Sequence, residues 1–315
     1  MVLRLMVVVA LGSVCWLAVA RGGDVQPART TTQPRPAEKG TRLVLLGTGT
    51  PNVDPERWGP ALAVVVDGQA YLVDCGPGVV RRAAAAQRGG IEALAARRLT
   101  HVFITHLHSD HTLGYPDLIF SPWVVGRETP LQAYGPPGLA RMTEHLRRAY
   151  EEDVHVRLHG LEPANPEGHK VKVHEIHPGP VYRDSNVRVT AFPVRHGNWK
   201  HAYGFRFETA DRVIVVSGDT APSPNLVQHA RGCDVLVHEV YSHAGFQDRS
   251  PEWKRYHAAF HTSTRELATI ACQVRPKLLV LTHQLFWGHT CRDLLAEIAQ
   301  SYDGEVRCGA DLDVY

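Results

Sequence analysis

Four potential metal ligands lie within six residues of this 315-residue sequence, in the segment Thr105-His106-Leu107-His108-Ser109-Asp110-His111. Imidazole and carboxylate groups together suit Zn, Mn or Fe. The apolar run Val102–Thr105 leads directly into this segment, so we expect a strand end that projects several side chains into one pocket. A polar turn with accidental histidines is the alternative, but so dense a set of ligands is far beyond chance. The segment predicts a metal site.

Three further candidate ligands each follow an apolar, strand-like run. His196 comes after residues 187–194, Asp219 after 213–217 and His283 after 278–282. Each of them alone could be an ordinary turn residue with a satisfied side chain. Two metals need roughly seven or eight ligands, and these three residues complete that number together with His106, His108, Asp110 and His111. We therefore expect a two-metal hydrolase.

A hydrolase of esters also needs an acid that protonates the leaving oxygen. Glu239 ends the apolar run 235–238, and His261 precedes a predicted helix. We expect catalysis to involve this pair together with Asp110. The plainer alternative is that Glu239 caps a turn and that His261 lies on the surface.

Weaker candidates for substrate contacts lie near these residues. His257 precedes His261 by four residues and would share its face of a helix, where it either contacts substrate or is solvated. Tyr241 and Trp199 flank predicted site residues, although aromatic residues in such places are often part of the core.

The hydrophobic pattern predicts an α/β (α+β) fold, in which mixed sheets are covered by helices. The strand-like runs are residues 43–46, 62–66, 71–73, 102–105, 131–134, 171–174, 187–194, 203–208, 213–217, 235–238 and 278–282. The helix-like segments are residues 79–97, 137–151, 262–272 and 291–301, and the third begins with a capping box in which Thr262 or Ser263 is paired with Glu266. Residues 160–183 are expected to form a long surface connection.

The N-terminus has the pattern of a secretory signal. Arg4 precedes an apolar run, and Ala18-Val19-Ala20 fits a cleavage site. We expect a signal peptide at 1–20, a flexible linker at 21–40 and a hydrolase domain at 41–315. An uncleaved membrane anchor is the alternative. The mature protein would then be exported, periplasmic or secreted, with no membrane attachment.

Charge and cysteine content add two limits. The formal net charge is +2, which gives no support to a nucleic-acid surface over the whole chain. Five cysteines follow the predicted signal peptide, and none forms a C-x-x-C pair, so a thiolate zinc knuckle is not expected. Cys291 and Cys308 could form a disulfide in an oxidising compartment.

The pattern H-x-H-x-D-H, followed by a separate His, Asp and His, resembles the metallo-β-lactamase superfamily. Residues 46–51 (LGTGTP), 73–78 (VDCGPG), 217–220 (SGDT), 238–241 (HEVY) and 261–263 (HTS) resemble its ribonuclease Z-like branch, which also includes arylsulfatases and cyclic phosphodiesterases. The resemblance runs from about Leu43 to the C-terminus. It implies an αββα sandwich with the metals at one edge, between the two sheets.

The resemblance also implies roles for single residues. His106, His108 and His196 would hold one metal, Asp110, His111 and His283 would hold the other, and Asp219 would bridge the two. The cofactors would be two Zn ions, with Mn or Fe possible. A hydroxide between the metals would attack the ester, and Glu239 would orient His261 at the leaving oxygen. Asp74 would have a structural role behind the ligands.

Two features favour a small anionic ester as the substrate. An exported enzyme would not meet transfer RNA, and only 22 residues separate His196 from Asp219, where ribonuclease Z proteins usually insert a long substrate-gripping arm. We therefore expect hydrolysis of sulfate-ester or phosphodiester bonds in small molecules and no nucleic-acid partner, with a homodimer implied by resemblance. The alternatives are a ribonuclease Z-like endonuclease of transfer-RNA 3′ ends, a lactonase or β-lactamase type of hydrolase, and a non-catalytic metal-binding module.

Overall fold

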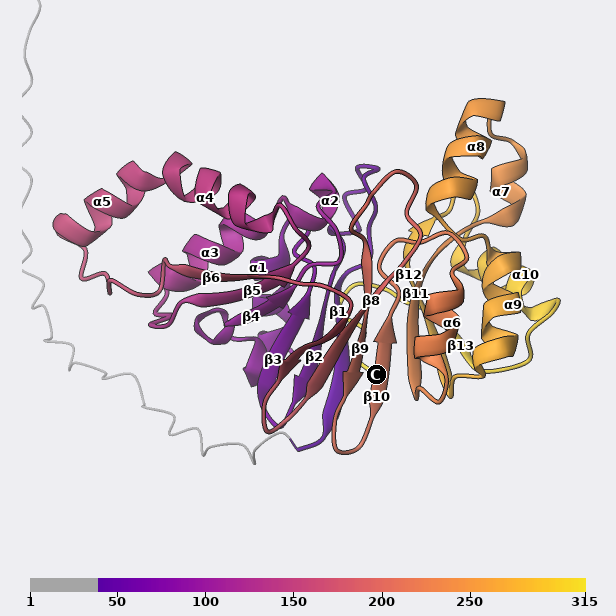
Figure 1. Ribbon diagram of the computed structural model, residues 1–315, viewed down its shortest axis with the longest axis horizontal. Helices are drawn as coiled ribbons and strands as arrows, with labels where there is room; N and C mark the ends of the chain where they lie inside the picture. The colour runs from indigo at the N-terminus through magenta and orange to yellow at the C-terminus, as the bar shows by residue number, and fades with distance from the viewer. Residues whose placement is uncertain (1–38) are drawn as a thin grey trace, which may run out of the picture. The chain divides into compact units, whose positions relative to one another are not determined.

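The computed structural model describes residues 39–315. Two β-sheets face each other in this part of the chain, and helices cover the outer face of each sheet (Figure 1). The αββα sandwich expected from the sequence is confirmed. The predicted signal peptide and linker residues 21–38 lie outside the described residues and stay predictions. No helix within residues 39–315 is both long and apolar enough to cross a membrane.

The first sheet has the strand order β1-β2-β3-β4-β5-β6. Its first three strands pair antiparallel, and β3, β4, β5 and β6 pair parallel. The bounds are β1 Thr41–Gly47, β2 Ala61–Val66, β3 Gln69–Val73, β4 His101–Phe103, β5 Leu131–Gly135 and β6 Val171–Glu175.

The second sheet has the order β13-β12-β11-β10-β9-β8-β7. Here β10 to β13 pair parallel, whereas β7 to β10 pair antiparallel. The bounds are β7 Gly179–Arg183, β8 Arg188–Pro193, β9 Tyr203–Glu208, β10 Val213–Val216, β11 Val235–Tyr241, β12 Leu278–Leu285 and β13 Val306–Cys308.

Helices α1 and α3 pack on the outer face of the first sheet, and α6, α9 and α10 pack on that of the second (Figure 1). The α-helices are α1 Val79–Arg88, α2 Ser109–Thr112, α3 Tyr115–Val124, α4 Leu139–Ala149, α5 Glu151–His159, α6 Pro224–Ala230, α7 His243–Gln247, α8 Pro251–Phe260, α9 Thr264–Val274 and α10 Cys291–Ala299.

The layers follow from the alternation of side chains along each strand. In β1, Leu43 and Leu45 point into the core between the sheets, and Val44 and Leu46 point to the helices outside. Both faces of this strand are buried, so its sequence is a continuous apolar run. A strand buried on both sides in this way needs helices over the sheet.

Several boundaries differ from the sequence-based expectation. The helix expected at 79–97 ends at Arg88, because Gly89 and Gly90 interrupt it and two short 3₁₀ turns follow. The capping box is present, with Ser263 as the cap and Glu266 as its partner. Glu239 and His283 lie inside strands that run further than expected and do not follow the strand ends.

Residues 160–183 are not the long surface connection that we expected. They contain β6 and β7, which are the edge strands of the first and the second sheet. The strand predicted at 171–174 is confirmed as β6, whereas β7 was not predicted, because Gly179 and Pro180 at its start hide the alternation that identifies a strand. Edge strands are half-exposed, so they do not need a continuous apolar run.

Candidate metal centre

The first four candidate ligands lie between the end of β4 and a one-turn helix. His106 and His108 belong to the turn after β4, and Asp110 and His111 lie in α2. His106, Asp110 and His111 are buried, and His108 is half-buried. This segment therefore follows directly on a strand of the first sheet, as the sequence predicted.

The remaining three candidates come from the second sheet. His196 follows β8, Asp219 follows β10 and His283 lies within β12, and all three side chains are buried. Their ligand atoms meet those of the first segment in clusters whose members lie within 4.8 Å of one another. One cluster contains His106, His108, His196 and Asp219; a second contains Asp110, His111 and His283; a third contains Asp219, His261 and His283.

Partners outside the cluster orient three of the rings. His111 donates from Nδ1 to Asp74 Oδ2 at 2.8 Å, and His196 donates from Nδ1 to the carbonyl of Phe260 at 2.8 Å. His106 Nδ1 lies 3.0 Å from Thr105 Oγ1, which itself donates to Asp74. With Nδ1 engaged, each ring turns Nε2 towards the cluster, which is the usual arrangement behind metal-binding histidines.

Asp74 is the centre of this supporting network. Its carboxylate accepts hydrogen bonds from the amide and the hydroxyl of Thr105 as well as from His111. Its backbone has a φ of 59°, which few residues other than glycine adopt. The structure thus places Asp74 behind the ligands, where the resemblance put it.

The electrostatics of the cluster differ from ring to ring. Burial lowers the pKa of His106 and of His196, the latter to about 4, so both rings are neutral near pH 7 and keep a lone pair. Burial also acts on His111, but Asp219, Asp74 and Asp110 outweigh it and hold its pKa well above the ordinary value. The carboxylates therefore make this pocket attractive to positive charge.

Trp199 contacts the cluster from one side. Its indole N–H donates to His108 Nε2 at 2.7 Å, so Nδ1 is the atom of His108 that faces His106 and His196. A neutral ring that accepts at Nε2 carries its proton on Nδ1, and a cation that binds there has to displace this proton. The structure thus places Trp199 against a candidate ligand.

His283 occupies an irregular position in its strand. The pairing of β11 with β12 shifts between Glu239 and Val240, and the extra residue on β12 is His283, with a φ of 45°. A bulge of this kind redirects a side chain, here towards Asp110, whose Oδ2 lies 3.2 Å from His283 Nε2.

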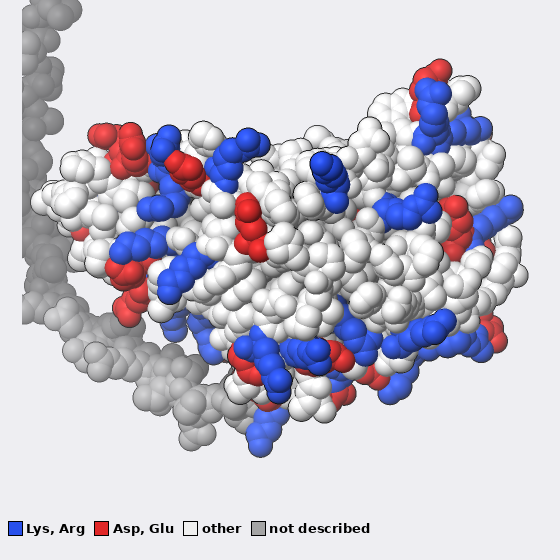
Figure 2. All heavy atoms as spheres, viewed as in Figure 1, with Lys and Arg blue, Asp and Glu red and all other residues white. Residues whose placement is uncertain are grey.

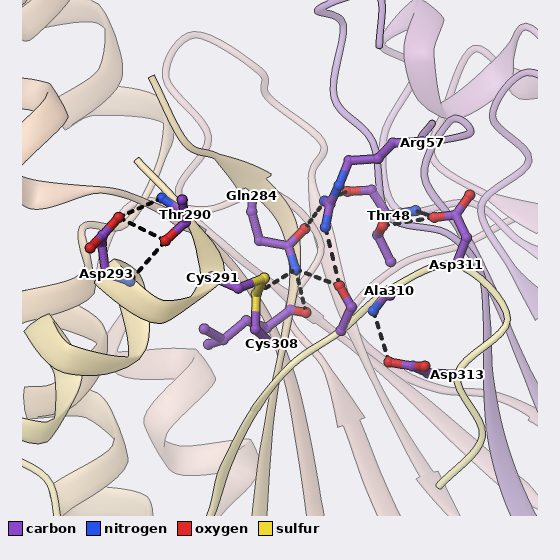
Figure 3. The surroundings of a disulfide bond; sticks show 12 residues. Thr48, Arg57, Gln284, Thr290, Cys291, Asp293, Cys308, Ala310, Asp311 and Asp313 are labelled. Atoms are coloured by element: carbon purple, nitrogen blue, oxygen red, sulfur yellow. Dashed lines mark hydrogen bonds between the residues drawn. A yellow bond between two sulfur atoms is a disulfide. The ribbon is translucent and has the colours of Figure 1, made fainter. Parts of the chain in front are cut away.

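The residue after this bulge is held by polar contacts that sequence reasoning missed. Gln284 donates from Nε2 to the carbonyls of Leu281 and Gly309, both at 2.9 Å, and its Oε1 accepts from Arg57 (Figure 3). Arg57 is itself half-buried, and its guanidinium lies 4.8 Å from the ring centre of Phe286. The network anchors the backbone on which His283 stands, and only the closeness of Gln284 to His283 in sequence hinted at it.

A disulfide lies at the edge of the same network. Cys291, at the start of α10, is bonded to Cys308, at the end of β13, 17 residues later (Figure 3). Gln284 Nε2 lies 3.7 Å from Cys308 Sγ. The pairing that the sequence allowed is therefore present, and of the three other cysteines in the described part only Cys272 is exposed.

Glu239 and His261 are neighbours at the centre. His261 Nδ1 lies 3.4 Å from Glu239 Oε1, and that oxygen accepts from the amides of Thr220 and Thr262, both at 3.1 Å. Burial and the nearby Asp219 raise the pKa of Glu239 well above its ordinary value, whereas burial lowers that of His261 to about 4. Neither side chain is the surface or turn residue of the plainer alternative.

The two other aromatic candidates lie beside His261. The ring of His257 is 5.7 Å from that of His261, and it is buried with Nδ1 unpartnered. Tyr241, at the end of β11, is buried and packs against Phe246 and Trp287 with ring distances of 5.1 and 5.4 Å. Tyr241 therefore belongs to an aromatic cluster next to His257, whose ring lies 6.4 Å from its own.

The donor set fits a divalent cation. His111 Nε2 is buried and has no hydrogen-bond partner, although Asp110 and Asp219 each place an oxygen 3.5 Å from it. A buried nitrogen without a partner is costly unless something binds it. Imidazole nitrogens and carboxylate oxygens at this spacing are the ligands that zinc and related ions prefer.

A cavity of about 390 Å³ adjoins the centre at Asp110. It is lined by the loop between β1 and β2, together with Ser109 and Leu113. Arg57 also lines it, but its guanidinium is engaged by Gln284. The wall of this cavity is therefore largely apolar beside the carboxylate.

Comparisons with known proteins agree with this geometry. The model of the beta-lactamase superfamily domain matches residues 69–284. A ribonuclease Z of Mycobacterium bovis (strain BCG / Pasteur 1173P2) is 36% identical over 276 residues, which cover 86% of this chain and 96% of that protein. A ribonuclease Z of Mycobacterium marinum is 35% identical over 246 residues, covering 76% and 85%.

Solved structures give the same picture. The short form of human tRNase Z superposes with a TM-score of 0.65 at 25% identity, over 87% of this chain and 98% of that one. A metallo-beta-lactamase fold protein from Bacillus subtilis superposes with a TM-score of 0.67 at 19% identity, over 87% and 98%. The second likeness concerns the fold alone.

These relatives overturn part of the expectation from sequence. The prediction of an exported arylsulfatase or phosphodiesterase of small molecules was wrong, and so was that of no nucleic-acid partner, because the relatives are ribonucleases. The names of these relatives also conflict with the expected description as a secreted or periplasmic protein with a signal peptide. The location of the protein stays a prediction.

The short segment between His196 and Asp219 does not distinguish this chain from the M. bovis ribonuclease Z. The alignment with the M. bovis protein is hardly longer than the part of this chain that it covers. That ribonuclease Z therefore contains no long insertion relative to this chain within the aligned region. The short sequence separation of His196 and Asp219 is thus compatible with a ribonuclease Z. The chain is a metal-dependent hydrolase that belongs to the metallo-β-lactamase superfamily and, within it, to the ribonuclease Z-like branch.

Proposed function

We propose that the protein is an endoribonuclease that cleaves the phosphodiester bond at the 3′ end of transfer-RNA precursors. The observation that carries this proposal is the 36% identity with a ribonuclease Z over nearly the full length of that protein. The tRNase Z likeness at 25% identity supports it. The candidate centre has the carboxylates, histidines and neighbouring acid that cleavage of a phosphodiester needs.

The proposal includes two divalent ions, zinc by preference. His106, His108 and His196 would hold one, Asp110, His111 and His283 would hold the other, and Asp219 would bridge them, in keeping with the clusters that these residues form. Ions bound there would lower the pKa of water and polarise the phosphodiester. Asp74, Thr105 and the carbonyl of Phe260 hold the histidine rings in the orientation that such ions would need.

The leaving oxygen of RNA is an alkoxide, which needs a proton as the bond breaks. His261 is the side chain in place to provide it, because its Nδ1 lies 3.4 and 4.0 Å from oxygens of Glu239 and Asp219. Burial lowers its pKa, and the negative charge of a bound phosphodiester would favour the protonated imidazole. Two backbone amides fix Glu239, so this carboxyl group orients the imidazole. We assign His261 as the general acid and Glu239 as its positioning residue.

The test uses the purified protein, loaded with Zn²⁺ or Mn²⁺, and a transfer-RNA precursor with a labelled 5′ end and a 3′ trailer. We expect one cut at the start of the trailer, and no cut in mature transfer RNA. Asp219→Ala should lose activity and bound metal together. p-Nitrophenyl sulfate serves as the comparison substrate. A metal-loaded protein that leaves the precursor intact would contradict the proposal.

A further inference from the structure

Helices α7 and α8 connect β11 to His261 and stand out beyond the edge of the second sheet (Figure 1). Only one residue of α8, His257, is buried. Trp253, in its first turn, is 55% exposed. A single exposed apolar side chain is common on protein surfaces, so what matters for Trp253 is its position beside the candidate centre.

The last turn of α8 is attached directly to the candidate metal centre. The carbonyl of Phe260 accepts from His196 Nδ1 at 2.8 Å, and that of Ala259 accepts from the amide of Gly197 at 3.0 Å. A Cβ on Gly197 would lie 2.0 Å from the ring of Phe260, so only glycine allows this approach. Helix α8 therefore forms part of the rim of the centre.

A row of three rings leads from solvent to the candidate acid. Trp253, His257 and His261 are spaced by four residues, which places successive rings on one side of the helix. The rings of Trp253 and His257 lie 5.5 Å apart at 24°, and those of His257 and His261 lie 5.7 Å apart. The exposed end of this row is the indole of Trp253.

Positive charge accompanies the tryptophan. Lys254 and Arg255 follow it on α8, and neither forms an ion pair within residues 39–315. Figure 2 shows basic side chains on this protruding end, with acidic ones among them. Asp248 and Glu252 are the neighbouring acids in sequence, so the segment from Asp248 to Arg255 keeps an excess of one positive charge when Arg249 is included.

We propose that α8 is the docking surface for the single-stranded part of the RNA substrate. A nucleobase stacks on Trp253, and Lys254 and Arg255, which leave the helix at ~100° and ~200° from the indole, contact the phosphates of a strand that passes around α8. This assignment rests on the proposed function. Single-stranded RNA fits because a stacking aromatic next to cations recognises any base and its backbone, whereas a folded protein partner would need a broader apolar surface than one indole.

The first experiment compares Trp253→Ala and Trp253→Phe on the precursor transfer RNA and on bis(p-nitrophenyl) phosphate. Stacking on one base predicts that Trp253→Ala raises KM for the RNA about 5- to 100-fold, and far less for the small ester. Trp253→Phe should recover most of the loss, because a phenyl ring still stacks. Tyr150→Ala is the control, since Tyr150 is 42% exposed at the end of α4 and should leave KM unchanged.

The second experiment measures the dependence of KM on salt. Lys254→Gln with Arg255→Gln should reduce the slope of log KM against log salt by ~1.4, because each lost phosphate contact to a single strand accounts for ~0.7. The control pair is Arg147→Gln with Arg148→Gln, two adjacent cations in the last turn of α4. An unchanged slope, or an equal effect of both pairs, would overturn the assignment of the cations.

Failure of this inference can be told apart from failure of the proposed function. If the wild-type protein does not cleave the precursor, the function fails, and an oligouridylate then tests α8 by quenching of tryptophan fluorescence. Quenching that is lost in Trp253→Ala supports the docking surface. Wild-type KM values in folded Trp253→Ala, or equal losses on both substrates, would overturn it, as would an oligonucleotide that does not bind.

Discussion

At the scale of single residues, the candidate centre depends on side chains that do not themselves face its middle. Asp74 accepts from His111 at 2.8 Å and from the hydroxyl of Thr105, which contacts His106. These contacts decide which ring nitrogen is free for a metal. They also hold each ring in one orientation and prevent its rotation, which lowers the entropic cost of metal binding.

Asp74→Asn tests this orientation. The amide cannot accept from Thr105 and His111 as a carboxylate does, so we expect zinc affinity to fall about 10- to 100-fold with the fold retained. Competition with a chelating dye measures the affinity. Asp117→Asn is the matched control, because Asp117 forms a surface ion pair with Arg81 at 3.4 Å. Equal affinities for Asp74→Asn and the wild type would show that Asp74 does not position the ligands.

His261→Ala tests the proposed acid. Protonation of the leaving oxygen matters most when that oxygen is a poor leaving group, as an RNA alkoxide is. We expect kcat for RNA to fall about 10²- to 10⁴-fold, and kcat for bis(p-nitrophenyl) phosphate to fall much less. The comparison variant is His243→Ala, whose side chain lies in α7 away from the clusters. Similar losses on both substrates would argue against His261 as the acid.

At the scale of elements, the parallel strands β10, β11 and β12 set the positions of three key side chains. Asp219 follows β10, Glu239 lies in β11 and His283 lies in β12, all towards the carboxyl ends of neighbouring strands. Parallel neighbours bring these ends to one edge of the sheet. The bulge in β12 then turns His283 into the cluster, where a regular strand would have sent it to the other face.

The disulfide between α10 and β13 permits a prediction on stability. The double variant Cys291→Ser, Cys308→Ser opens a loop whose ends lie 17 residues apart, so the unfolded chain gains conformational entropy. The free energy of unfolding should fall by about 3 kcal/mol. Chemical denaturation with urea measures the change in the free energy of unfolding. Cys272→Ser is the control, because this cysteine is exposed and free. A double variant as stable as the wild type would show that the disulfide does not stabilise the fold.

At the scale of the whole molecule, both sheets contribute to one centre. His106, Asp110 and His111 follow the first sheet, whereas Asp219 and His283 belong to the second. Bound metal therefore adds a link between halves that also meet through their apolar faces and through polar contacts such as that of Arg57 with Gln284. Stability and metal binding should be linked in this protein.

Removal of metal tests this linkage. A ligand that binds only the folded state stabilises it by about 4 kcal/mol when its free concentration is about 1,000 times Kd. We expect treatment with EDTA to lower Tm and added Zn²⁺ to restore it. Asp219→Ala should lack most of this response, because it removes a carboxylate that two of the clusters share. The same Tm with and without metal would contradict the linkage.

The sequence by itself predicted the superfamily, the sandwich and all seven candidate ligands. The superfamily and the sandwich were implied by the family resemblance, whereas the ligands could be identified from residue types placed near the ends of apolar runs. The candidate acid pair could be predicted for the same reason. The position of Asp74 behind the ligands came from the family resemblance, and the distances to Thr105 and His111 now give it a physical cause.

Other features depend on contacts between residues far apart in the chain, and only the tertiary structure decided them. The bulge at His283, the hydrogen bond from Arg57 to Gln284 and the attachment of α8 to His196 leave no periodic signal in the sequence. The substrate class was mistaken because it was argued from a predicted export signal and from an arm that the chain seemed to lack. The four ligands from His106 to His111 could be recognised directly, because neighbours in sequence are necessarily neighbours in space, whereas the surfaces that select a substrate arise only when distant segments pack together.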